Sequence, residues 1–208
     1  MKQLLQFAIG LSLLVSLPVF AIGDADAGQG KAAVCAACHG ADGNSVVPNW
    51  PKIAGQHAPY LQRQLALIKD GSRPVPEMTA ISMNLSDQDM ADLAAYFASQ
   101  TTSAGLTDEA LRASGERLYR SGNTETDIPA CMSCHGPAGE GNPLSGYPNL
   151  AGQHSVYSEK MLTGFRAGTT WGADDASSKI MTGVANRLTD AEIKAVASYM
   201  QGLHSVKE

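Results

Sequence analysis

Apolar side chains recur at helical spacing in the first half of the chain. Leu61, Leu65 and Ile68 stand at positions i, i+4 and i+7, so they would share one face of a helix. The pair Asp70-Gly71 follows and supplies a helix-ending signal. The pattern therefore predicts an amphipathic helix over residues 60–69.

A second helix is predicted further along, and its start carries a capping signal. Ser86 is followed by two acidic residues in the first turn, which is typical of a helix N-cap. From there to about Ser99, Leu93, Tyr96 and Phe97 form an apolar side. The other elements predicted in this half are a short helix at 25–33 and Gly- and Pro-containing loops at 40–51 and 71–85.

The amino terminus is apolar in a different way, as a continuous run rather than a periodic one. Lys2 precedes an apolar run from Leu4 to Phe20, and the small residue Ala21 comes before polar sequence. Residues 1–21 therefore have the form of a secretory signal peptide. A retained membrane anchor is the alternative, but the run is a little short for a span. We expect export, cleavage, and a mature protein that is soluble or only peripherally attached to a membrane.

The second half of the chain repeats the plan of the first. Residues 50–57 match residues 147–154 at an offset of 97, and residues 85–87 match residues 188–190 at an offset of 103. The second half therefore has about six extra residues, which we place around 169–178. Self-similarity at this interval indicates a tandem duplication rather than a solenoid. The predicted units are a signal peptide at 1–21 and two domains at 22–104 and 105–208, with small polar linker residues at 100–110.

Composition limits the function classes. The 208 residues are 44% hydrophobic but only 6% aromatic, which is lean for two small cores. A buried macrocycle would supply the missing apolar bulk. The formal charge is −5, and it becomes −6 when Lys2 leaves with the signal peptide, which argues against nucleic-acid binding.

All four cysteines fall in two copies of the motif C-x-x-C-H-G. This is the attachment signature of c-type haem, in which two thiols add to the porphyrin vinyl groups and the adjacent imidazole binds the iron. A redox C-x-x-C or half of a zinc site would be the alternative for one copy, but two full copies favour haem. The sequence thus predicts two covalently bound haem c groups. The predicted attachment residues and proximal ligands are Cys35, Cys38 and His39 in the first copy and Cys131, Cys134 and His135 in the second.

The sixth iron ligand decides the function class, because a haem with one protein ligand can bind gases or peroxide, whereas a second protein ligand closes the iron. Met78 lies eight residues before Ser86, and Met181 lies eight residues before Thr189. Methionine is ordinarily core filler, but these two share one point of the repeat. We predict them as axial ligands in loops. Met83 has no counterpart and is predicted to be packing.

Two paired histidines compete for the same position. His57 and His154 each stand where a Gly-containing loop enters a helix, 18 or 19 residues after the proximal histidine. Ligation of both irons by two histidines therefore stays an alternative. We prefer a capping, propionate-contacting or domain-interface role for them.

Two prolines and two arginines complete the candidate site. Pro51 and Pro148 close the loop after each motif, where a carbonyl could accept the distal N–H of the ligand imidazole and fix its tautomer. Punctuation of a turn is the alternative role for these prolines. Arg73 and Arg166 are candidates for pairing with haem propionates, with a solvated face as the alternative.

With these residues in place, the chain resembles the di-haem cytochrome c4 family, whose members have tandem class I cytochrome c domains. The resemblance rests on the two C-x-x-C-H-G motifs, the twin A-G-Q-H segments, the matched methionines and the closing helices at 89–99 and 191–201. It implies an all-α fold of two cytochrome c domains related by pseudo-twofold symmetry, with facing haem propionate edges.

The same resemblance implies a periplasmic electron carrier and not an enzyme. Such a protein would pass single electrons between respiratory-chain components, for example from a quinol-cytochrome c reductase towards a terminal oxidase, often in association with the membrane.

Three alternatives from other classes stay open. The first is the di-haem electron-accepting subunit of a dehydrogenase, such as a flavocytochrome sulfide dehydrogenase. The second is a di-haem peroxidase, which needs an open iron, and the two matched methionines argue against it. The third is a haem-based gas-binding module, which carbon monoxide binding to the reduced protein would support.

Overall fold

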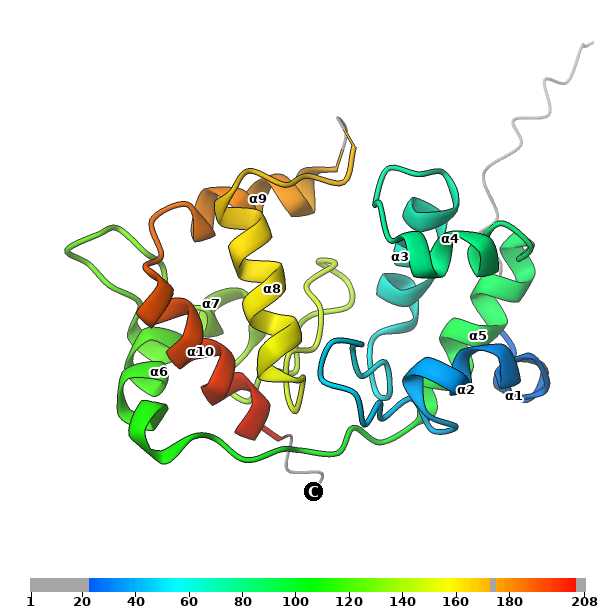
Figure 1. The fold of residues 1–208 in the computed structure, drawn as a ribbon, viewed down its shortest axis with the longest axis horizontal. Helices are drawn as coiled ribbons and strands as arrows, with labels where there is room; N and C mark the ends of the chain where they lie inside the picture. The colour runs from blue at the N-terminus through cyan, green and yellow to red at the C-terminus, as the bar shows by residue number, and fades with distance from the viewer. Residues whose placement is uncertain (1–22, 173–174, 205–208) are drawn as a thin grey trace, which may run out of the picture.

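The computed structural model describes residues 23–172 and 175–204, and within them the chain is helical, with two isolated β-bridges and no sheet. The predicted signal peptide lies outside the described residues. Figure 1 shows α1–α5 on one side of the molecule and α6–α10 on the other, joined by an extended linker. The helices of the first half are α1 (Ala25–Lys31), α2 (Ala33–His39), α3 (Ala58–Lys69), α4 (Pro76–Ser82) and α5 (Asp87–Ser99). Those of the second half are α6 (Glu109–Ser121), α7 (Met132–His135), α8 (Ser155–Arg166), α9 (Ala176–Ala185) and α10 (Asp190–Gly202).

Two of the predicted boundaries need correction. The single helix expected at 25–33 is two helices, because the chain turns at Ala32, which ends α1 and begins α2. The loop expected at 71–85 contains α4, which starts at Pro76. Proline is favoured at the first position of a helix, so this residue starts an element that the sequence analysis assigned to a loop. The helix predicted at 60–69 is confirmed as α3, and the one predicted from Ser86 is confirmed as α5.

The capping signals form as expected in both halves. Ser86 accepts a hydrogen bond from the Asp89 N–H, and the Asp89 carboxylate accepts one from the Ser86 N–H. Thr189 and Glu192 make the same capping box at the start of α10. Each box satisfies two backbone donors at a helix end that would otherwise lack a partner.

In each half, the first helix crosses the last one at a glycine. A Cβ on Gly28 would lie 2.1 Å from the carbonyl oxygen of Asp92, and a Cβ on Gly115 would lie 2.3 Å from that of Ala195. Only glycine permits such an approach of two backbones. The crossing of α1 on α5 and of α6 on α10 is therefore the same structural unit, used twice.

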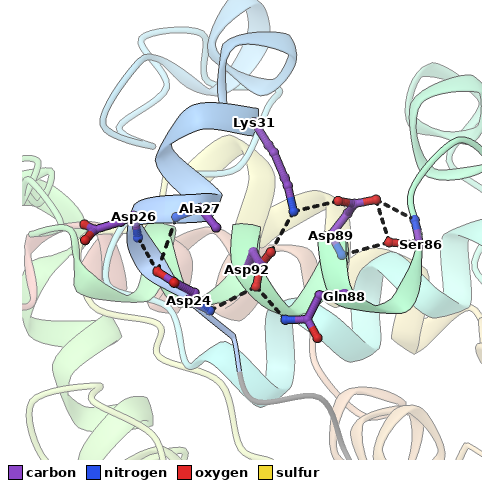
Figure 2. Close-up of polar contacts among 8 residues, drawn as sticks. All are labelled: Asp24, Asp26, Ala27, Lys31, Ser86, Gln88, Asp89 and Asp92. Carbon is purple, nitrogen blue, oxygen red and sulfur yellow. Dashed lines mark hydrogen bonds and ion pairs between the residues drawn. The ribbon is translucent and has the colours of Figure 1, made fainter.

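A polar cluster around Asp92 reinforces this crossing in the first half (Figure 2). The Lys31 ammonium lies 2.7 Å from a carboxylate oxygen of Asp89 and 2.6 Å from one of Asp92. Asp92 also accepts hydrogen bonds from the Asp24 N–H and from Gln88. Ala195 stands in place of Asp92 in the second half. The two crossings therefore share their close approach at a glycine but not the cluster around Asp92.

The apolar clusters differ in size between the halves. In the first half the buried cluster consists of Ala32, Leu93 and Phe97, with half-buried Cys35 and Ile53 among the side chains packed against it. The second half has a larger cluster around Tyr119, Trp171 and Val196. So small a buried cluster in the first half agrees with a domain in which a bound macrocycle provides much of the core.

Two glutamines join the halves in a reciprocal way. The Gln153 side chain accepts a hydrogen bond from the Lys52 N–H at 2.9 Å and donates one to the Lys52 carbonyl at 2.8 Å. Gln56 makes the same pair with the backbone of Asn149, at 2.9 and 2.8 Å. Because each half supplies the glutamine that the other half receives, this interface has pseudo-twofold symmetry, and the predicted all-α tandem fold is confirmed.

Candidate functional site

The first C-x-x-C-H motif lies on α2, and its histidine ends that helix. His39 is only 7% exposed, and its Nδ1 lies 2.8 Å from the Pro51 carbonyl oxygen. A carbonyl only accepts, so Nδ1 carries the proton, and in the neutral ring Nε2 holds a free lone pair. Burial lowers the pKa of His39, and the Pro51 carbonyl opposes this shift in part. The ring is therefore kept neutral with one nitrogen prepared to bind a metal.

The second motif has the same arrangement on α7. His135 is 7% exposed, and its Nδ1 lies 3.0 Å from the Pro148 carbonyl oxygen. Burial again lowers the pKa of His135, with the carbonyl acting in opposition. Both proline carbonyls therefore accept the imidazole hydrogen bond that the sequence led us to expect, which is the geometry that would orient a ligand imidazole.

The four cysteines are unpaired, so neither motif forms a disulfide. Burial raises the pKa of the Cys35 thiol, and it raises that of Cys131 to about 11. A reactive redox cysteine needs a lowered pKa, and the pKa values of Cys35 and Cys131 shift in the opposite direction. A zinc site is likewise unsupported, because no group of three or more His, Cys, Asp or Glu side chains gathers within residues 23–172 and 175–204. Two unpaired cysteines beside a buried imidazole in each motif fit covalent haem attachment.

The two predicted methionine ligands lie in short helices, not in the loops that we expected. Met78 is in α4 and Met181 is in α9, each four residues before the last residue of its helix. Both side chains are half-buried, and Met181 packs against the core of its domain. The structure thus gives them equivalent places in the two halves. Met83, by contrast, is 63% exposed, so the prediction that it is a packing residue is wrong.

The paired histidines after the motifs contact the opposite half. His154 Nε2 lies 2.7 Å from the Ser45 carbonyl oxygen, in the loop after the first motif. The ring of His57 approaches the backbone of Glu140, in the loop after the second motif. Burial lowers the pKa of both histidines. These positions correspond to the domain-interface role preferred from the sequence.

The two candidate arginines differ in what they contact. Arg166 donates to the Leu188 carbonyl and pairs with Asp190, and its counterpart in the first half, Lys69, donates to the Leu85 carbonyl. Lys69 thus ties the end of α3 to the start of α5, and Arg166 ties the end of α8 to the start of α10, which is a structural role within each domain. Arg73 instead contacts residues of the other half.

Two further features escaped the sequence analysis. The interface function of the twin glutamines was one, although their repetition in the A-G-Q-H segments was a usable signal. The other is Tyr119, which is fully buried and donates a hydrogen bond of 2.7 Å to the carbonyl oxygen of Gly136, directly after His135. Burial raises its pKa. Ala32 holds the equivalent place in the first half, so no repeat signal pointed to this tyrosine.

Comparison with known proteins agrees with this geometry. The family model for cytochrome c matches residues 25–101 and 113–204. The chain is 53% identical to cytochrome c4 of Pseudomonas aeruginosa, over 93% of this chain and 98% of that relative. The chain belongs to the cytochrome c4 family. A crystal structure of reduced cytochrome c4 from Pseudomonas stutzeri superposes with a TM-score of 0.83 at 52% identity, covering 88% of this chain and 100% of that one. A thiosulfate dehydrogenase electron acceptor of Stutzerimonas stutzeri is 38% identical, over 81% of this chain and 78% of that protein.

Membership in the cytochrome c4 family settles the cofactor and the function class. The chain binds two covalent haem c groups, one for each C-x-x-C-H motif, as predicted. It is a di-haem electron-transfer cytochrome rather than an enzyme, as its cytochrome c4 relatives are. Over the described ranges, no helix combines the length and hydropathy that a membrane crossing requires.

Proposed function

We propose that this cytochrome carries single electrons between respiratory-chain components in the periplasm, towards a terminal oxidase. The bound haems supply one-electron exchange at iron. The proposed covalent attachment points are Cys35, Cys38, Cys131 and Cys134, and the proposed axial ligands are His39 and Met78 in the first domain and His135 and Met181 in the second.

The observation that supports this proposal best is the equivalent placement of Met78 and Met181, each in a short helix before the closing helix of its half. A thioether is a soft ligand that favours Fe(II) and raises the reduction potential. Two protein ligands on each iron also exclude a substrate from it. This combination favours electron carriage over peroxide chemistry or gas binding.

The location and the partners follow from the same proposal. Export through the leader at 1–21 would deliver the chain to the compartment where c-type haem is attached, with 22–104 and 105–208 as the two haem domains. A quinol-cytochrome c reductase would be the donor and a terminal oxidase the acceptor. Sequencing the amino terminus of periplasmic protein tests the export step, and an intact Met1 on membrane-bound protein would contradict it.

A second candidate is an electron acceptor for a dehydrogenase. The likeness to a thiosulfate dehydrogenase electron acceptor favours it, and a flavocytochrome sulfide dehydrogenase is a related possibility from the sequence. Rates of reduction by purified quinol-cytochrome c reductase and by purified dehydrogenase would separate the two. Faster reduction by the dehydrogenase would replace the respiratory role.

The axial ligands are tested by replacing each methionine in turn. Met78→Ala and Met181→Ala should each lower the potential of one haem and allow its reduced iron to bind carbon monoxide, while the other haem changes little. A redox titration followed by optical and EPR spectra reports both effects. Met83→Ala is the matched control, because this exposed side chain should affect neither iron.

Two results would contradict the ligand assignment. If Met83→Ala opens the first haem while Met78→Ala does not, the alignment of the repeat is wrong at the ligand. If both ligand variants leave the spectra unchanged but His57→Ala and His154→Ala alter them, both irons are held by two histidines, and the argument for a high potential fails.

A further inference from the structure

Arg73 belongs to the first domain, but most of the partners of its side chain belong to the second. Its guanidinium donates to Gln64 Oε1 at 2.6 Å within its own domain and to the Tyr157 hydroxyl oxygen of α8 at 2.9 Å. The same group lies over the ring of Trp171, 4.4 Å from the centroid. A cation over an indole face, with two hydrogen bonds at its edge, is held in both distance and orientation.

A second arginine of the first domain makes a neighbouring contact. Arg63 of α3 forms an ion pair with Asp175, whose side chain is only 2% exposed. Removing the partner of so buried a carboxylate leaves an unpaired charge, which is unfavourable. The positions 97 residues after Arg63 and Arg73 hold Lys160 and Thr170, so the two contacts are not repeated by the pseudo-twofold symmetry.

Trp171 and Asp175, which these arginines contact, lie in the stretch at 169–178 where the second half is longer than the first. Trp171 is 6% exposed, its ring is 5.4 Å from that of Phe165, and its backbone N–H donates to Ser178 Oγ. Asp175 caps α9 by accepting a hydrogen bond from the Ser178 N–H. Contacts within the second domain thus hold Trp171 and Asp175 in place independently of the two arginines.

The two kinds of interface contact lie at different ends of the interface. The glutamine contacts are next to the linker, because the Lys52 ammonium donates to the Ser103 carbonyl at 2.6 Å. In Figure 1 the α3–α4 connection, which contains Arg73, and helix α9 lie at the end opposite to the linker. Contacts beside the linker restrain the far ends of the two domains less than contacts made at those ends. The arginine contacts at the far end therefore further restrict rotation of one domain against the other.

We propose that Arg73 is a positioning residue for electron exchange between the two haems. The contact of Arg73 with Trp171, together with the ion pair of Arg63 and Asp175, fixes the orientation of the two domains. This orientation in turn sets the separation of the two haems. This inference depends on the di-haem electron-transfer function but not on the identity of the axial ligands or of the external partners.

The test uses the full-length protein with both haems bound. Arg73→Gln should slow electron exchange between the haems of half-reduced protein by about tenfold, because fewer molecules hold the productive orientation. Exchange is followed by NMR line shapes or after photoreduction. Pulsed EPR between the ferric haems should show a broader distance distribution. The optical spectra and the resistance of both reduced irons to carbon monoxide should stay as in the wild type.

Arg112→Gln is the matched control, since it removes an exposed arginine whose partner is Glu109 on the same helix, and it should leave the exchange rate unchanged. Trp171→Phe keeps an aromatic ring in the core but weakens the cation–π contact with Arg73. As a single variant it should slow electron exchange between the haems, and in combination with Arg73→Gln it should slow exchange no further than Arg73→Gln does.

The proposal is overturned if Arg73→Gln keeps the wild-type exchange rate and distance distribution. It is also overturned if this variant opens an iron to carbon monoxide, because Arg73 would then act on a haem site rather than on domain orientation. Additive slowing by Trp171→Phe would likewise exclude a shared contact. A wild-type protein with open irons would instead refute the proposed function.

Discussion

The helix crossing at Gly28 offers a sharp test of the packing argument. In Gly28→Ala the new Cβ would lie 2.1 Å from the carbonyl oxygen of Asp92 and 2.8 Å from Cβ of Tyr96. Ordinary contact begins at 3.4 Å, so α1 and α5 must separate by about 1.3 Å. The nearest atom is a backbone carbonyl oxygen, which cannot move away by a change of side-chain rotamer. Overpacking of this kind costs typically 1–3 kcal/mol, and we expect about 3 kcal/mol here.

For a domain of this size, a loss of about 3 kcal/mol lowers the unfolding midpoint by roughly 12–24 °C. Thermal unfolding of the holoprotein, followed by circular dichroism and haem absorbance, measures this shift. Gly30→Ala is the control on the same helix, because its Cβ would meet nothing within 4 Å. It should stabilise the helix by up to about 1 kcal/mol, since alanine is the better helix former.

Close packing of α1 on α5 at Gly28 is refuted if Gly28→Ala unfolds within about 2 °C of the wild type, the range expected for a surface change. It is also refuted if Gly30→Ala loses as much stability as Gly28→Ala, because helix propensity rather than close approach would then be responsible.

Two other predictions concern one domain each. The Asp24 N–H, followed by the Lys31 ammonium, holds the pKa of Asp92 at about 2, below its usual 3.8. The stability contributed by this carboxylate is therefore present above about pH 4 and is lost as the pH falls towards 2, so Asp92→Asn should flatten the acid limb of a plot of unfolding midpoint against pH. In the second domain, Tyr119→Phe removes the hydrogen bond to the Gly136 carbonyl and should cost about 1–2 kcal/mol in urea unfolding of that domain. An unchanged urea midpoint would show that water replaces the phenol.

Local chemistry made much of this protein predictable. The helix at 60–69 and the capping box at Ser86 depend on side chains within a few residues of one another, and both form as expected. The C-x-x-C-H motifs carry their chemistry in five consecutive residues, and the repeat showed which methionines share a position. Even the orienting carbonyls of Pro51 and Pro148 could be anticipated, because each lies 12 or 13 residues from its histidine.

Contacts between distant segments were decided only by the tertiary structure. The segment around Met78 is a short helix, but the prolines near it are also typical of a loop, so the sequence did not predict the helix. Proline at the first position of a helix can be recognised as a start signal only when the rest of the helix is known. Gly28 approaches a backbone 64 residues away, and Arg73 contacts Trp171 across the domain interface. No periodic pattern in the sequence predicts either contact. The duplication made contacts that occur in both halves, such as those of the two proline carbonyls, predictable from the sequence. The asymmetric ones arise where the two copies have diverged, and only packing of one domain against the other selects them.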